Sequence, residues 1–167
     1  AAQFEEILRK LVSIHETDDL FFSFYLDMHD KSSLADQIAR LASTLEPALD
    51  VPGRRGLYEA ITALHDLAAK QDIGEAQGLA FFYRSGSSPF KRYIKFHLPV
   101  ESWASADCLP NIVPLIEMKD SYDRYIVLIS TEEHARIMEI VFGTVSREAW
   151  LECPEIRKRA GREETRE

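Results

Sequence analysis

Cysteine is scarce in this chain of 167 residues, which contains only Cys108 and Cys153. The two cysteines lie in dissimilar contexts, with no Cys-x-x-Cys spacing and no cluster of histidines beside them. The sequence therefore predicts neither a disulfide framework nor a zinc site, and it indicates a reducing, cytoplasmic location. Cys108 is a candidate nucleophile, but a half-buried, inert thiol is several times more common at such a position.

Long apolar runs are also missing, since no stretch approaches the roughly 18 residues that a membrane-spanning helix requires. The opening AAQFEEILRK has neither the basic nor the apolar region of a signal peptide. The phosphate-binding motifs GxGxxG and GxxxxGK and the nucleophile motif GxSxG do not occur. We expect no membrane partner, no cofactor and no metal, because the histidines have no ligand spacing: His15, His29, His65, His97 and His134.

Positive charge is in deficit, and the net charge is −8. An acidic domain is repelled by phosphate, so any contact with nucleic acid has to come from a local basic patch. The densest such patch comprises Arg157, Lys158, Arg159 and Arg162, near the end of the chain. Runs of charge at chain ends are commonly solvated, so this signal is weak by itself.

Apolar residues make up 46% of the chain, which is ample for one large domain or two small ones. The spacing in FEEILRKLVSI predicts an amphipathic helix, and LFFSFYLDM predicts a buried strand from Leu20 to about Asp27. A second helix follows, capped by Ser32 or Ser33 and broken by Pro52 and the glycines of VPGRRG. LYEAITALHDLAAKQ then predicts a third helix.

The segments QGLAFFYRSG and KRYIKFHLPV predict a hairpin that turns at SGSSPF. The aromatic residues at 21–25 and 81–83 are assigned to the core, because the glycine and lysine interleaving of RNA-binding sheets is missing. From Leu98 the chain becomes rich in proline and loses its alternation, which predicts a connection. That connection includes a short helix with Pro114 in its first turn.

The stretch SYDRYIVLISTEEHARIMEIVF is the most regular in the chain and predicts a β-hairpin with one buried face. The alternation places these apolar side chains on that face: Tyr125, Val127 and Ile129 before a polar turn, then Ala135, Ile137 and Ile140 or Val141. A third strand is predicted in FGTVSREAWLE, after a turn at Gly143. The hairpin has no nucleophile, no oriented base and no metal ligands, so we interpret it as a scaffold.

These elements predict an α+β fold in three parts. Residues 1–98 form an N-terminal helix-strand-helix-helix-hairpin domain, and residues 99–119 form the proline-containing connection with its short helix. Residues 120–167 begin a second domain. The order of GLAFFYRSG, PFKRYIKFHLP and NIVPLIEMKDSYDRYIVLISTEEHARIMEIVFGTV carries further information.

This order resembles the junction between the first two domains of archaeal and eukaryotic class I peptide-chain release factors and Pelota. It resembles their bacterial relatives, the bacterial archaeo-eukaryotic release factor families, more closely. The resemblance runs from about Val12 to Arg166 and is firmest from Gly78 to Thr144. It implies that residues 120–167 open an RNase-H-like mixed sheet and that the chain is the N-terminal part of a longer protein.

Release factors of this family carry a Gly-Gly-Gln loop after these strands, preceded by basic residues and a Gly-Arg pair. The glycines let the backbone approach the ester of peptidyl-tRNA, and the glutamine positions water. The resemblance places the candidate RNA or ribosome contacts at Arg157, Lys158, Arg159, Gly161 and Arg162. Where the loop would follow, this chain has Glu163, Glu164 and Thr165. We therefore expect no catalytic residue and no hydrolysis of peptidyl-tRNA by this chain.

Two functions stay open from the sequence. The first is a translation or ribosome-rescue protein that binds the ribosome or tRNA, although nothing between Leu20 and Leu57 resembles the family's basic stop-codon loop. The alternative is a non-catalytic protein-interaction or regulatory domain on the same scaffold, which the acidic charge and the replaced glycines favour. A hydrolase that uses Cys108, or the acid pairs at 18–19 and 132–133, has little support, because adjacent acids in turns diverge into water.

Overall fold

The computed structural model describes residues 2–29, 34–70, 74, 76–122, 124–141 and 143–152. Residues 1–123 and 124–167 form two compact units. The first unit contains α1 (Ala2–Val12), β1 (Phe21–Asp27), α2 (Leu34–Leu45), the 3-10 turn η2 (Glu46–Ala48), α3 (Val51–Ala69), β2 (Gly78–Arg84), β3 (Phe90–Phe96), β4 (Trp103–Asp107) and α4 (Val113–Ser121). The second contains β5 (Tyr125–Ser130), β6 (His134–Val141) and β7 (Thr144–Glu152). The predicted α+β class is confirmed.

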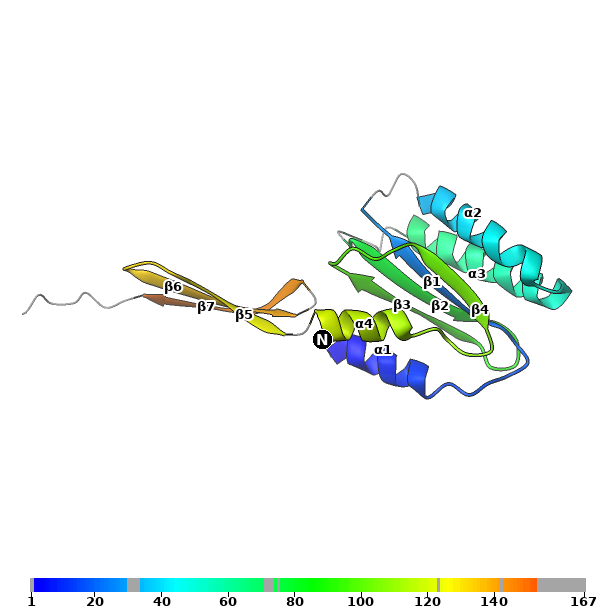
Figure 1. Cartoon of the computed structure of the whole chain (residues 1–167), viewed down its shortest axis with the longest axis horizontal. Helices are drawn as coiled ribbons and strands as arrows, with labels where there is room; N and C mark the ends of the chain where they lie inside the picture. The colour runs from blue at the N-terminus through cyan, green and yellow to red at the C-terminus, as the bar shows by residue number, and fades with distance from the viewer. Residues whose placement is uncertain are drawn as a thin grey trace, which may run out of the picture. The chain divides into compact units, whose positions relative to one another are not determined.

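The first unit is an antiparallel sheet of strand order β3-β2-β1-β4 with helices on both faces. Figure 1 shows α2 and α3 over one face of this sheet and α1 and α4 over the other. Because helices cover both faces, six consecutive residues of β1, 21–26, are buried, which explains why all of them except Ser23 are apolar or aromatic. The prediction that the aromatic stretches belong to the core is confirmed for 21–25 and for Phe81 and Phe82.

The two faces of the sheet bury different side chains. Phe22, Phe24 and Leu26 belong to the core shared with α2 and α3. On the other face, Phe4 of α1 meets Phe96 edge-on, with ring centroids 6.3 Å apart. The Tyr25 hydroxyl donates to the carbonyl of Asn111 over 2.7 Å, which holds the segment that leads into α4 against the sheet.

The helix α3 begins at Val51, so the predicted break at Pro52 is wrong. Asp50 caps the helix: its Oδ1 accepts a hydrogen bond from the backbone N–H of Gly53 over 2.8 Å. Proline is favourable in a first helical turn, where its missing N–H would have no partner in any case. A Cβ on Gly56 would lie 3.1 Å from the Phe22 ring. The proline and glycines of VPGRRG, which predicted a helix break, therefore lie in the first turns of α3, and Gly56 packs closely against β1.

The expected connection over 99–119 is wrong for residues 103–107, which form β4. This strand pairs antiparallel with β1, from Phe21 opposite Asp107 to Tyr25 opposite Trp103. WASAD has weak strand propensity, and its conformation depends on the hydrogen bonds that β1 offers. The short helix with Pro114 in its first turn is confirmed as α4. No helix in the described part of the chain is long and apolar enough to cross a membrane.

The second unit is an antiparallel sheet of order β5-β6-β7, which confirms the predicted hairpin and third strand. Val127 lies opposite Met138, and Leu128 lies opposite Ile137. Directly paired residues share a face, so Val127 and Ile137 lie on opposite faces and the predicted single apolar face is wrong. Apolar side chains are instead divided between the two faces, and several of them, including Leu128 and Trp150, are exposed.

Candidate functional site

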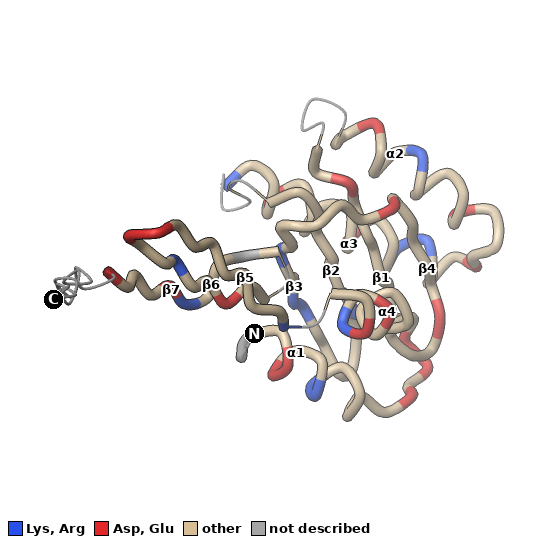
Figure 2. The backbone as a smooth tube through the Cα atoms, turned by 60° about the vertical axis from the view of Figure 1, so that its left-hand side comes forward, with Lys and Arg blue, Asp and Glu red and all other residues tan. Residues whose placement is uncertain are grey.

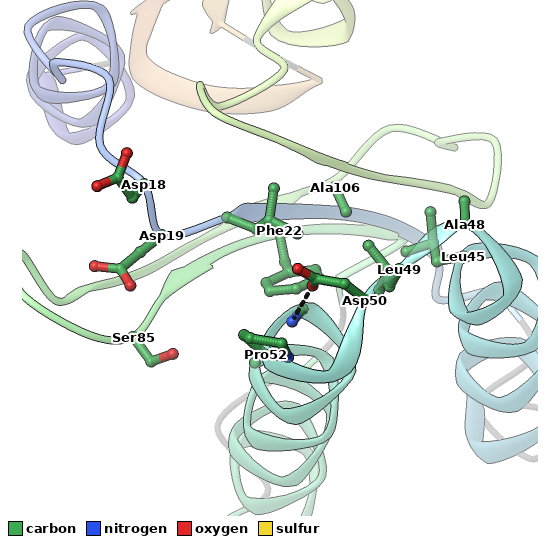
Figure 3. A pocket seen from close by; sticks show the side chains of 13 residues that line it. Asp18, Asp19, Phe22, Leu45, Ala48, Leu49, Asp50, Pro52, Ser85 and Ala106 are labelled. Atoms are coloured by element: carbon green, nitrogen blue, oxygen red, sulfur yellow. Dashed lines mark hydrogen bonds between the residues drawn. The ribbon is translucent and has the colours of Figure 1, made fainter.

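A hollow of about 540 Å³ opens at the start of α3 (Figure 3). Figure 3 shows Asp50 bonded to a backbone nitrogen in the first turn of α3, with Asp18 and Asp19 on the segment that leads into β1. Ser85, at the end of β2, lies on the same wall. The lining of the hollow is therefore acidic, and the positive end of the helix is already occupied by Asp50.

The carboxylate of Asp19 holds the turn between β2 and β3. The backbone N–H and the hydroxyl of Ser87 both donate to Asp19 Oδ2 over 2.9 Å. Gly86 has a φ of 90°, and a Cβ there would lie 2.3 Å from Asp19 Oδ2, so only glycine fits this turn. Since Asp19 and Asp50 are committed to structural hydrogen bonds, the hollow does not offer a pair of free carboxylates for acid-base catalysis.

Neutralising Asp19 is expected to remove part of the pH dependence of stability. Hydrogen bonds from Ser87 hold the pKa of Asp19 below its usual value of 3.8. A carboxyl whose pKa is lower in the folded state contributes stability above the unfolded value and loses it as pH falls through the folded value. Urea unfolding should show Asp19→Asn less stable than the parent at pH 6, with the difference in stability shrinking progressively as the pH falls below 3.8. A constant difference across this range, or the same loss in Asp120→Asn on exposed α4, would contradict the assignment.

Basic and aromatic side chains gather where α3 lies beside β2 and β3. A hollow of about 410 Å³ is lined by Arg55, Tyr58 and Tyr83. A second hollow, of about 330 Å³, is lined by Tyr83, Lys91 and Arg92. The two hollows meet at Tyr83, whose partner across the strands is Lys91, and Figure 2 shows basic residues along β3. We call these five residues the α3/β3 surface.

The cations of the α3/β3 surface are available to a partner. Arg55 Nε lies 3.3 Å from Glu59 Oε1, but the arginine side chain is 83% exposed, and such surface pairs are weak. Lys91 forms no ion pair within the described residues. The guanidinium of Arg92 lies 5.9 Å from the centre of the Phe90 ring and donates to the carbonyl of Lys91 over 2.8 Å. Arg92 pairs with Phe82, so it projects from the opposite face of the edge strand β3 to Lys91 and lines the second hollow at the edge of the sheet. Glu59 and Asp66 also line the first hollow, so the positive charge is concentrated toward β3.

The aromatic part of this surface includes one exposed, oriented ring. The hydroxyl of Tyr58 donates to the carboxylate of Glu46, and this hydrogen bond raises the pKa of the tyrosine. The Tyr58 side chain is exposed although its hydroxyl is held. Exposed rings beside flexible cations are the combination that binds single-stranded nucleic acid, because bases stack on the rings while cations contact phosphates.

The structure does not support nucleophilic catalysis by Cys108. Its Sγ donates to Asp107 Oδ1 over 3.2 Å, and Glu16 Oε1 lies 3.6 Å from the sulfur. The hydrogen bond to Asp107, with partial burial and the charge of both carboxylates, raises the pKa of the thiol. A reactive thiolate requires the opposite electrostatic setting. The described residues contain no group of three His, Cys, Asp or Glu side chains that could hold a metal ion.

The sequence-predicted contacts Arg157, Lys158, Arg159, Gly161 and Arg162 lie outside the described residues. The residues of the α3/β3 surface were missed, because RRG was interpreted as part of a helix break and KRYIK as ordinary strand alternation. The available signal was the pair of adjacent cations in each segment. The two segments lie close to each other because α3 contacts β2, and this contact is not visible in the sequence.

The fold is similar to solved structures of archaeal proteins. The crystal structure of the archaeal translation termination factor aRF1 matches 88% of this chain at 15% identity, with a TM-score of 0.55. A second archaeal protein matches 90% at 14% identity, with a TM-score of 0.54. The chain spans 43% and 44% of the lengths of these two proteins. No protein-family model and no curated protein sequence matches it. The likeness establishes a release-factor-like fold without distinguishing bacterial from archaeal families.

Proposed function

We propose that this chain is the N-terminal part of a release-factor-like protein of translation or ribosome rescue, acting on the ribosome in the cytoplasm. The observation that carries this proposal is the match to the archaeal termination factor over 88% of the chain. The finer assignment to the bacterial archaeo-eukaryotic release factor families rests on the resemblance of the segments from Gly78 to Thr144.

The α3/β3 surface supports a contact with RNA. A chain with a net charge of −8 is repelled by ribosomal RNA at a distance, so binding requires local cations that replace the counterions of individual phosphates. Arg55 supplies such a cation in the hollow that Tyr58 lines, and Lys91 and Arg92 supply two more in the adjoining hollow. The segment 157–162 is the second proposed RNA contact. The replacement of Gly-Gly-Gln by Glu163, Glu164 and Thr165 favours binding without hydrolysis.

Charge reversal at the α3/β3 surface is expected to weaken ribosome binding. Full chain would be co-sedimented with 70S ribosomes from about 50 to about 300 mM salt, since phosphate contacts weaken steeply with salt. The triple variant Arg55→Glu, Lys91→Glu and Arg92→Glu should bind about tenfold or more weakly and lose about two units of the logarithmic salt slope.

The matched control has the same change in net charge at exposed cations elsewhere, with Arg40→Glu, Lys70→Glu and Lys119→Glu. It should retain most of the parent's binding, and unfolding curves of both variants should show intact folds. Failure of the parent to sediment with ribosomes at low salt would overturn the proposal. An equal loss in both triple variants would show that overall charge, and not this surface, governs the association.

The second candidate function is a non-catalytic protein-interaction domain on the same scaffold. The net charge of −8 favours it, as does an acidic pocket of aromatic residues between β4 and α4. The two candidates are separated by the ribosome experiment, because a protein-interaction domain shows no salt-dependent sedimentation with ribosomes.

A further inference from the structure

A pocket of about 340 Å³ lies in the first unit, between the start of β4 and α4. Aromatic rings, prolines and two carboxylates line it, notably Tyr25, Trp103, Tyr122, Pro114, Glu101 and Glu117. The volume is at the small end of the range of about 300–1,000 Å³ for ligand pockets. It therefore suits a single side chain better than a large cofactor.

The floor of the pocket is rigid and its walls reach solvent. Tyr25 is only 1% exposed. Its ring meets Phe82 edge-on, at 5.9 Å between centroids. The Trp103 ring lies 6.0 Å from Tyr25 and is 39% exposed, and Tyr122 is 40% exposed. The two outer rings thus keep apolar faces available for an inserted group, which would gain by covering them.

The two glutamates at this pocket are exposed, and their carboxylates form no ion pair or hydrogen bond within the described residues. On α1 and α3, by contrast, Glu5, Glu6 and Glu59 each pair with a cation one helical turn away. Glu101 and Glu117 come from different segments, so the fold brings two unneutralised carboxylates to one aromatic pocket. This combination is complementary to a cation and repels phosphate.

We propose that this pocket binds an arginine side chain presented by a protein partner. A guanidinium stacks on an indole face and donates parallel N–H groups to a carboxylate, while its methylene stem covers apolar surface. Trp103 and Tyr122 supply the faces, and Glu101 and Glu117 accept the hydrogen bonds. This site is distinct from the α3/β3 surface, because β4 and β3 form opposite edges of the sheet.

The test uses the full chain with Trp150→Phe, which leaves Trp103 as the single tryptophan of the two present. The probe is the capped tripeptide acetyl-Gly-Arg-Gly-amide, followed by tryptophan fluorescence, and the matched probe carries citrulline, a neutral isostere of arginine. An affinity on the order of 1 mM is expected, because one side chain makes few contacts. The citrulline peptide should bind about tenfold or more weakly, since it lacks the charge.

The carboxylates are tested by substitution. Glu101→Gln and Glu117→Gln should each weaken arginine binding about threefold to tenfold, and the double variant more, whereas Glu132→Gln in the second unit should have no effect. The proposal is overturned if the arginine peptide does not bind, if citrulline binds equally, or if the double variant keeps the parent's affinity. Saturable quenching of Trp103 by a hexauridylate probe would assign the pocket to RNA instead. Concentration-dependent dimerisation that protects Trp103 would assign it to a second copy.

Discussion

Replacing Arg84 with methionine is expected to lower the free energy of unfolding by about 3 kcal/mol. Arg84 is only 4% exposed, although it carries a charge. Its Nε donates to the carbonyl of Ser88 over 2.8 Å, and one terminal nitrogen donates to the carbonyl of His15 over 3.1 Å. The guanidinium also lies 5.5 Å from the centre of the Phe21 ring. It thus ties the segment before β1 to the turn between β2 and β3.

Methionine fills similar volume but donates no hydrogen bond, so two backbone carbonyls lose their partner in a part-buried site. Each such loss costs about 1–3 kcal/mol. Arg84→Lys keeps the charge but cannot reproduce the planar fork, and it should fall between the parent and the methionine variant. Urea unfolding at pH 7 measures all three. Arg92→Met, at an exposed position of β3, should change stability by less than about 0.5 kcal/mol; equal effects at both positions would show that the fork is not what stabilises this corner.

Replacing Gly78 with alanine is expected to destabilise the first unit by about 2–4 kcal/mol, because the new methyl group overpacks a well-packed site. A Cβ at this position would lie 2.4 Å from Val100 Cγ2 and 2.9 Å from the carbonyl oxygen of Leu98. Gly78 pairs with Asp27 on one side and Phe96 on the other, so a shift of its backbone disturbs both neighbouring strands.

A double variant identifies the contact responsible. Val100→Ala removes the methyl group at 2.4 Å and leaves the carbonyl in place. It should recover part of the stability lost by Gly78→Ala, with a coupling free energy of about 1 kcal/mol or more between the two positions. Gly74→Ala is the control for a glycine-to-alanine change without a clash, because no atom lies within 4 Å of a Cβ there; its positive φ of 57° should by itself cost about 1 kcal/mol. Thermal or urea unfolding in which the two changes at 78 and 100 are simply additive would refute the steric explanation.

The two proposed contacts of the first unit draw on different elements. The α3/β3 surface uses the start of α3 and one edge strand, and the arginine pocket uses the other edge strand and α4. The two proposals therefore predict binding at separate places on the domain, so that one partner should not exclude the other. The acidic net charge, which disfavours RNA at long range, favours the basic protein segment.

Local sequence was sufficient for much of the fold. The α+β class, the first two helices, the short helix after Ile112 and the strands at 21–27 and 78–84 follow from periodicity and composition, because each of these elements buries a face that its own residues define. The aromatic core could be predicted for the same reason. A continuous run such as FFSFYL has to be covered on both sides.

Other features depended on residues distant in the chain. WASAD is a strand because β1 offers an unpaired edge, and Gly56 is accommodated inside α3 because its missing side chain leaves room for the Phe22 ring. The faces of the hairpin were predicted incorrectly because alternation specifies a period but not the register between two strands.

Local sequence patterns were enough to predict the fold class and most of the helices and strands of this chain. Which charged and aromatic residues meet depends instead on tertiary contacts. The contact of α3 with β2 brings Arg55 and Lys91 to two adjoining hollows. The packing of α4 beside β4 brings Glu101 and Glu117 to one pocket. Periodicity depends on residues that are close together in the sequence. A binding surface is built from residues that are far apart in the sequence, and no local pattern specifies which of them come together.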